Sequence, residues 1–169
     1  MSVTLHTFTE MYVRTLDVAD HLLAKGVEFA AANDVSEADM LEWRLADDMN
    51  PLAFQLAIVC NFPRSWLARA ADLPVPDLVT SELDVAGFRA AIVDAKAYVR
   101  AITPAQLAGR DDVEIEVTLG NDFTQTHSIE KWITGFATTN IYFHLSMVYA
   151  ILRHKGVQIG KLDLFPTGL

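Results

Sequence analysis

Apolar residues recur every three or four positions in four long segments of this 169-residue chain, and this spacing constrains the fold more than any other feature. It places the apolar side chains of each segment on one face of an α-helix, and that face must be buried against a partner. Four such helices favour an all-α fold, a four-helix bundle. The predicted helices span residues 4–31, 50–71, 84–102 and 128–154.

Capping residues set several of these helix limits. Thr4 is a candidate N-cap of the first helix, and Gly26 is a weak point near its end. Asn50 followed by Pro51 is a typical helix start, because proline suits the first helical position. Between the first two helices we expect a structured loop, in which the capping sequence 36–39 predicts one short helix.

The hydrophobic period changes from about 3.6 residues to about 2 over residues 113–119, where apolar and polar residues alternate. This alternation is typical of a strand. The turn residues Gly120, Asn121 and Asp122 follow, and residues 123–128 supply a partner strand. Because an isolated hairpin is only marginally stable, we expect it to lie across the bundle and pack on the helices, just before the last helix begins.

The composition fits one soluble domain over residues 1–169. Hydrophobic residues make up 51% of the chain, yet no apolar run is long enough to span a membrane. The 22 acidic and 13 basic residues give a net charge of −9, which disfavours nucleic acid and membrane surfaces as partners. Cys60 is the single cysteine and can form no intrachain disulfide. The start of the chain does not resemble a signal peptide, so the predicted location is cytoplasmic.

Three polar residues interrupt the apolar stripes. Asn140 and His144 lie one turn apart on the predicted inward face of the last helix, and Gln55 lies on the apolar face of the second. Leaving them buried and unpaired would cost about 1–3 kcal/mol each. They therefore either satisfy one another or a buried water, or line a pocket for a small molecule in which His144 is the candidate catalytic base. The predicted inward positions of the last helix are Ile129, Ile133, Phe136, Asn140, His144, Met147 and Ile151.

Motifs for metals and cofactors do not occur in the sequence. It contains no HExxH, no CxxC and no two histidines four residues apart, so these patterns predict no metal site. It also contains no nucleotide-binding glycine motif and no nucleophile elbow, so no cofactor is predicted. Cys60 is expected to be a free, buried thiol.

Two segments carry a resemblance to a known family. Residues 45–55 (LADDMNPLAFQ) and 142–161 (YFHLSMVYAILRHKGVQIGK) look like the bacterial domain of unknown function nineteen-ninety-three, and the resemblance covers nearly the whole chain. That family resembles in turn the DinB/YfiT-like metalloenzyme superfamily. The resemblance implies a DinB-like four-helix bundle and a homodimer. For better-studied branches it implies a three-histidine metal site with bacillithiol or mycothiol transferase or maleylpyruvate isomerase activity.

The resemblance also indicates where those metal ligands would fall. The HxxxH pair of the last metal helix falls on Asn140 and His144, and the first ligand falls on Ile58, so one histidine of three remains. The resemblance adds Asp48, next to Asp47, as a candidate binding residue. Carboxylates just before a helix are more often capping or dipole partners, which is the alternative role for this pair.

Three functions follow from these observations. The first is a small-molecule-binding protein whose core pocket has lost the three-histidine metal site. The second is a metal-dependent, thiol transferase-like enzyme. The third is a non-catalytic dimeric module in which hydrogen-bonded side chains fill the old site. The access of water to His144 separates the first from the third.

Overall fold

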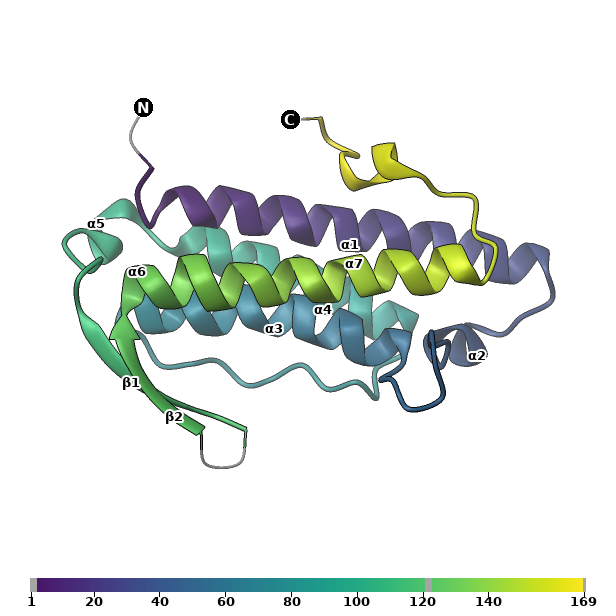
Figure 1. Cartoon of the computed structure of the whole chain (residues 1–169). Helices are drawn as coiled ribbons and strands as arrows, with labels where there is room; N and C mark the ends of the chain where they lie inside the picture. Colours follow the sequence, from purple (N-terminus) through teal and green to yellow (C-terminus); the bar gives the residue numbers. More distant parts are fainter. Residues whose placement is uncertain (1–2, 121–122, 169) are drawn as a thin grey trace.

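Four long helices lie side by side in the computed structural model, which describes residues 3–120 and 123–168 (Figure 1). Each packs against its neighbours through the apolar face that the sequence spacing indicates. The predicted all-α four-helix bundle is therefore confirmed. No helix in these two described stretches is long and apolar enough to cross a membrane. The four are α1 (Thr7–Ala32), α3 (Leu52–Ala70), α4 (Val85–Ala101) and α7 (Thr138–His154).

Two helices begin at side-chain caps, one at the predicted capping sequence 36–39 and one at Asp84, the predicted first residue of its helix. The Ser36 hydroxyl accepts a hydrogen bond from the Asp39 backbone N–H at 3.0 Å and begins α2 (Glu37–Leu41), the short helix predicted in the first loop. The Asp84 carboxylate accepts from the Gly87 N–H at 2.7 Å and begins α4. A short helix that was not predicted, α5 (Pro104–Leu107), follows α4.

Two other helix starts were predicted wrongly. Thr4 and Thr7 form a turn, in which the Thr7 N–H donates to the Thr4 carbonyl at 2.9 Å, so α1 begins at Thr7 without the Thr4 side chain as its cap. At α3, Pro51 has an extended backbone with ψ 173° and is itself the N-cap. Asn50 lies outside the helix, and its carbonyl accepts a hydrogen bond from the Gln55 side chain instead.

The predicted hairpin is confirmed, and it projects from one end of the bundle (Figure 1). Its strands pair antiparallel, with Leu119 opposite Phe123. Two of the predicted turn residues, Asn121 and Asp122, lie outside the described residues. The Trp132 indole N–H donates to the Ile115 carbonyl at 3.1 Å, so the hairpin packs on the start of the last helical segment. The strands are β1 (Glu114–Leu119) and β2 (Phe123–Ser128).

A π-helical turn, η1 (Trp132–Ala137), lies between α6 (Ile129–Lys131) and α7. A π-turn holds one residue more than an α-turn, so it moves the buried face of the next helix forward by one position. The predicted inward placement of Asn140 and His144 is therefore wrong by one residue, and both side chains are half-buried at the edge of the core. The buried positions are Ala137, Ile141, Leu145 and Val148, in place of Phe136, Asn140, His144 and Met147.

The buried Tyr12 on α1 contacts this π-turn. The Thr138 hydroxyl donates to the Ile133 carbonyl at 2.7 Å, so the Tyr12 hydroxyl donates to Thr138 at 3.0 Å. Burial raises the pKa of Tyr12, which keeps the phenol protonated. The hydroxyl pair therefore helps to hold η1 in the arrangement that moves His144 to the core edge.

The chain beyond α7 folds back over α1 and ends on the same side of the bundle as the N-terminus (Figure 1). This C-terminal segment contains the turn η2 (Lys161–Leu164). One carboxylate oxygen of Asp163 lies 2.8 Å from His21 Nε2 on α1, and the other accepts from the Gly160 N–H at 2.7 Å. The two contacts attach the segment to the bundle.

Acid should release the C-terminal segment. Hydrogen bonding to His21 holds the pKa of Asp163 below its ordinary value. A carboxyl whose pKa is lowered by folding contributes stability that is complete above its unfolded pKa and is lost as pH falls through the folded pKa. In an NMR titration we expect the Gly160 and Leu164 amide signals to move together only below about pH 4. The Asp163→Ala variant should show the released signals at neutral pH, and unchanged signals in both experiments would contradict the attachment.

Candidate functional site

The candidate site lies between α3 and α7, where two of the three predicted polar residues meet. Gln55 Oε1 on α3 lies 2.7 Å from His144 Nδ1 on α7. Gln55 is 3% exposed, in the first turn of its helix, whereas His144 is half-buried. The pair joins residues 89 positions apart in the sequence, so it depends on the packing of the two helices.

The orientation of the Gln55 amide determines the tautomer of His144. Gln55 Nε2 donates to the Asn50 carbonyl at 3.0 Å, which leaves Oε1 facing the imidazole. An amide oxygen can only accept, so Nδ1 carries the proton and donates. In the neutral ring, Nε2 then holds a lone pair. Within the described residues, no protein group forms a hydrogen bond with Nε2.

Aromatic rings surround the His144 side chain. The ring centroids of Phe54, Phe62 and Phe143 lie 6.1, 6.3 and 5.1 Å from the imidazole. Burial lowers the pKa of His144, so the ring is neutral at physiological pH. Phe143 is itself 53% exposed, which leaves the site close to solvent. The arrangement combines one basic nitrogen with flat apolar surfaces.

A row of packed aromatic rings continues from His144 toward the hairpin. Phe62 packs against Phe136 with centroids 6.0 Å apart, and Trp66 stacks on Trp132 at 5.1 Å. The row ends at a cavity of about 330 Å³ between the hairpin and η1, which Trp132 and Phe136 help to line. The apolar spacing predicted buried positions for Phe62, Trp66 and Phe136, and Trp66 is buried in the core together with Trp132. The four- and eight-residue spacing of Phe54, Phe62 and Trp66 is the signal that could have placed them on one face.

The other two predicted binding residues lie apart from this pair. Asn140 donates through Nδ2 to the Phe136 carbonyl of its own helix at 2.8 Å rather than to Gln55 or His144. Asp48 is exposed in the turn before α3. The N-cap of α3 receives no side-chain hydrogen bond, so neither Asp47 nor Asp48 caps this helix in that way.

Cys60 on α3 is a free, buried thiol, as predicted. Burial raises its pKa to about 12, with a smaller opposing effect from Arg64. A thiol with so high a pKa is protonated at neutral pH, and the thiolate is the nucleophilic form. Cys60 therefore belongs to the core rather than to the candidate site.

The donor atoms around His144 do not fit a three-histidine metal centre. The resemblance implies that Ile58 stands where the first ligand would be, and the Asn140 amide donates to the Phe136 carbonyl of its own helix. Among the residues that the structure describes, no group of three or more His, Cys, Asp or Glu side chains is placed to hold a metal ion. One imidazole nitrogen is too small a ligand set for a zinc site, which needs three or four.

The comparisons with known proteins agree with this fold. The chain matches the family model described as Domain of unknown function (DUF1993) over residues 5–165. The chain belongs to this family. This DUF1993 member is also similar to the crystal structure of a DinB family member protein from Shewanella denitrificans. The two chains are 26% identical with a TM-score of 0.80, and the similarity covers 92% of this chain and 88% of that one.

No curated protein matches this DUF1993 member. The family and the DinB-like fold that the two sequence segments indicate are confirmed. The site of this DUF1993 member is described by its own residues: the Gln55–His144 pair and the aromatic rings beside it.

Proposed function

We propose that this DUF1993 member binds a small, flat organic molecule at His144 without a metal ion. The observation that carries the proposal is the chain of hydrogen bonds from Asn50 through Gln55 to His144. It favours the proton on Nδ1, and burial favours the neutral ring, in which the Nε2 lone pair is available; the ligand is therefore one that donates a hydrogen bond to Nε2. If proton transfer follows binding, His144 is the general base.

The surroundings of His144 support a mostly apolar ligand. Phe54, Phe62 and Phe143 offer ring faces and edges that favour an aromatic molecule. Asn140 lies one turn before His144, and its Oδ1 is the second polar contact in this proposal. Asp48, which is exposed before α3, would contact only a ligand that extends beyond Asn50. An O–H or N–H group on an aromatic body is the chemistry that these groups recognise together.

Phenol and toluene test this proposal, because the two molecules have similar shapes and only phenol has a hydrogen-bond donor. We expect phenol to shift the His144 and Gln55 side-chain NMR signals with a Kd on the order of 1 mM, as small ligands do. Toluene should bind at least about tenfold more weakly. His144→Phe keeps a ring but removes the lone pair, and it should abolish the preference for phenol. His154→Phe, at the exposed end of α7, is the matched control.

Two results would contradict the proposal in different directions. Equal binding of phenol and toluene in the unmodified protein, or no binding of either, would favour the non-catalytic module. Near-stoichiometric zinc or nickel, measured by plasma mass spectrometry and lost in His144→Ala, would favour the metal-dependent, thiol transferase-like enzyme. The proposal predicts far less than one zinc or nickel ion per chain, both in the unmodified protein and in His144→Ala.

A further inference from the structure

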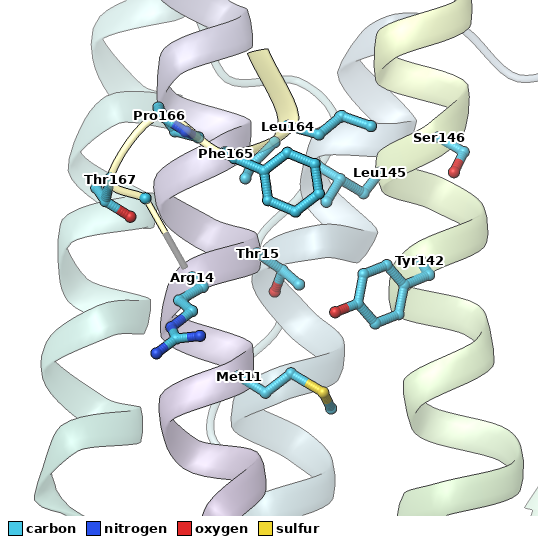
Figure 2. A pocket seen from close by; sticks show the side chains of 12 residues that line it. Met11, Arg14, Thr15, Tyr142, Leu145, Ser146, Leu164, Phe165, Pro166 and Thr167 are labelled. Atoms are coloured by element: carbon cyan, nitrogen blue, oxygen red, sulfur yellow. The ribbon is translucent and has the colours of Figure 1, made fainter. Parts of the chain in front are cut away.

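A second cavity, of about 230 Å³, lies between α1, α7 and the C-terminal segment (Figure 2). Most of its walls are apolar: Met11 and Val18 come from α1, Leu145 from α7, and Leu164 and Phe165 from the C-terminal segment. A fully apolar cavity of about 150 Å³ holds one benzene molecule. This cavity therefore has room for an apolar body somewhat larger than benzene.

This cavity is separate from the candidate site at His144. Tyr142 and Ser146 line it, and each is two residues from His144. Two residues correspond to about 200° of rotation around an α-helix, so they lie on the opposite side of α7. A ligand in this cavity does not contact the Gln55–His144 pair.

The polar groups of the cavity indicate the chemistry of its ligand. Arg14 is the only charged residue among the described residues that line it, in a chain of net charge −9. Figure 2 shows the Tyr142 hydroxyl directed across the cavity toward Thr15, with Arg14 at the edge beside Thr167. The Thr15 hydroxyl already donates to the Tyr12 carbonyl at 2.8 Å. Besides the Ser146 and Thr167 hydroxyls, the Tyr142 phenol and the Arg14 guanidinium line the cavity as donors. Both suit an anionic acceptor.

We propose that this cavity binds a monocarboxylate with an apolar body, of the size of a medium-chain fatty acid. The hydrocarbon chain lies against the walls formed by Val18, Leu145 and Leu164, and the carboxylate lies between Arg14 and Tyr142. The C-terminal segment forms the outer wall, and its contact with His21 holds it in place. This site is independent of the function proposed at His144.

Octanoate and 1-octanol test this proposal by isothermal titration calorimetry, because they share a chain length and differ in charge. We expect octanoate to bind the unmodified protein at one site and more tightly than 1-octanol. Ser146→Trp fills the cavity from its exposed edge and should weaken octanoate binding by at least about tenfold. Arg14→Met should weaken octanoate by about tenfold and leave 1-octanol unchanged. Arg89→Met, exposed on α4, is the control and should change neither.

NMR locates the bound octanoate without relying on variants. The methyl signal of Met11 should shift on addition of octanoate, while the His144 ring signals stay in place. Equal octanoate binding in Ser146→Trp, or an unmoved Met11 signal in the unmodified protein, would overturn the proposal. So would an equal loss of octanoate and 1-octanol binding in Arg14→Met. Phenol binding at His144 is scored separately, so failure at one site leaves the other site testable.

Discussion

Replacing Asn61 with alanine should lower the free energy of unfolding by about 2–4 kcal/mol. The Asn61 side chain on α3 is 6% exposed. It donates to the Val79 carbonyl at 2.9 Å and accepts from the Val79 N–H at 2.8 Å. These two bonds hold the segment 71–83, which runs along the outside of α3 and connects it to α4 (Figure 1). Alanine removes both bonds and leaves two backbone groups of Val79 without these partners, which is the source of the large cost.

Urea denaturation of the unmodified protein and two variants measures this effect. Asn33→Ala is the matched control, because Asn33 is exposed and makes one side-chain bond, to the Phe29 carbonyl at 2.8 Å. We expect the control to lose less than about 0.5 kcal/mol. Hydrogen exchange should also become faster at Val79 in Asn61→Ala. Similar losses in the two variants would show that the segment is not held through Asn61.

Replacing Gly26 with valine should lower the free energy of unfolding by about 2–3 kcal/mol. Gly26 was predicted as a weak point near the end of the first helix, but α1 continues through it, and the residue is buried. A Cβ at this position would lie 2.9 Å from Leu152 Cδ2 and 3.1 Å from Met40 Sδ. Both side chains are fully buried, so neither can move aside freely. The steric cost exceeds the gain of less than about 1 kcal/mol in helix propensity.

A double variant separates steric crowding from other causes. Leu152→Ala alone should be destabilising, since it leaves a cavity in the core. If Leu152 is the obstacle, the Gly26→Val and Leu152→Ala pair should lose at least about 0.5 kcal/mol less than the sum of the two single losses. Simple additivity in thermal or urea unfolding would mean that α1 and α7 do not limit the side chain at position 26.

The bundle could be predicted from the sequence because the patterns that specify its helices and hairpin involve residues close together in the chain. Apolar spacing identifies the four long helices, and the change to a period of two identifies the hairpin. Ser36 and Asp84 cap helices where their sequence contexts indicate, since an N-cap bond joins residues only three positions apart. Thr4 and Asn50 look equally suitable as N-caps, but neither side chain caps its helix. Instead, their backbone carbonyls accept hydrogen bonds, from the Thr7 N–H and from the Gln55 side chain.

Features that depend on distant contacts could not be predicted. The π-turn η1 shifts the buried face by one residue, and its contact with Tyr12 on α1 depends on how the helices pack. The tight approach at Gly26 also joins elements far apart in the sequence, and the two bonds from Asn61 to Val79 join residues 18 positions apart. A periodic pattern read along one segment contains no information about them.

The candidate site was predictable in part. Gln55 and His144 both interrupt apolar stripes, which is the signal that suggested they would meet, and they do. The same signal placed Asn140 with them, but the extra residue in η1 and the nearby Phe136 carbonyl give it a different partner. The role of the Asn50 carbonyl in orienting Gln55 has no signature in the sequence, because a backbone group makes the contact.

The tautomer of His144 is the most direct test of the proposed function. Two-dimensional ¹H–¹⁵N NMR through the imidazole two-bond couplings distinguishes a protonated nitrogen from one with a lone pair. At neutral pH we predict a neutral ring with the proton on Nδ1 and the lone pair on Nε2, and Gln55→Leu should allow the other tautomer to appear. A proton on Nε2, or a charged ring in the unmodified protein, would contradict the account.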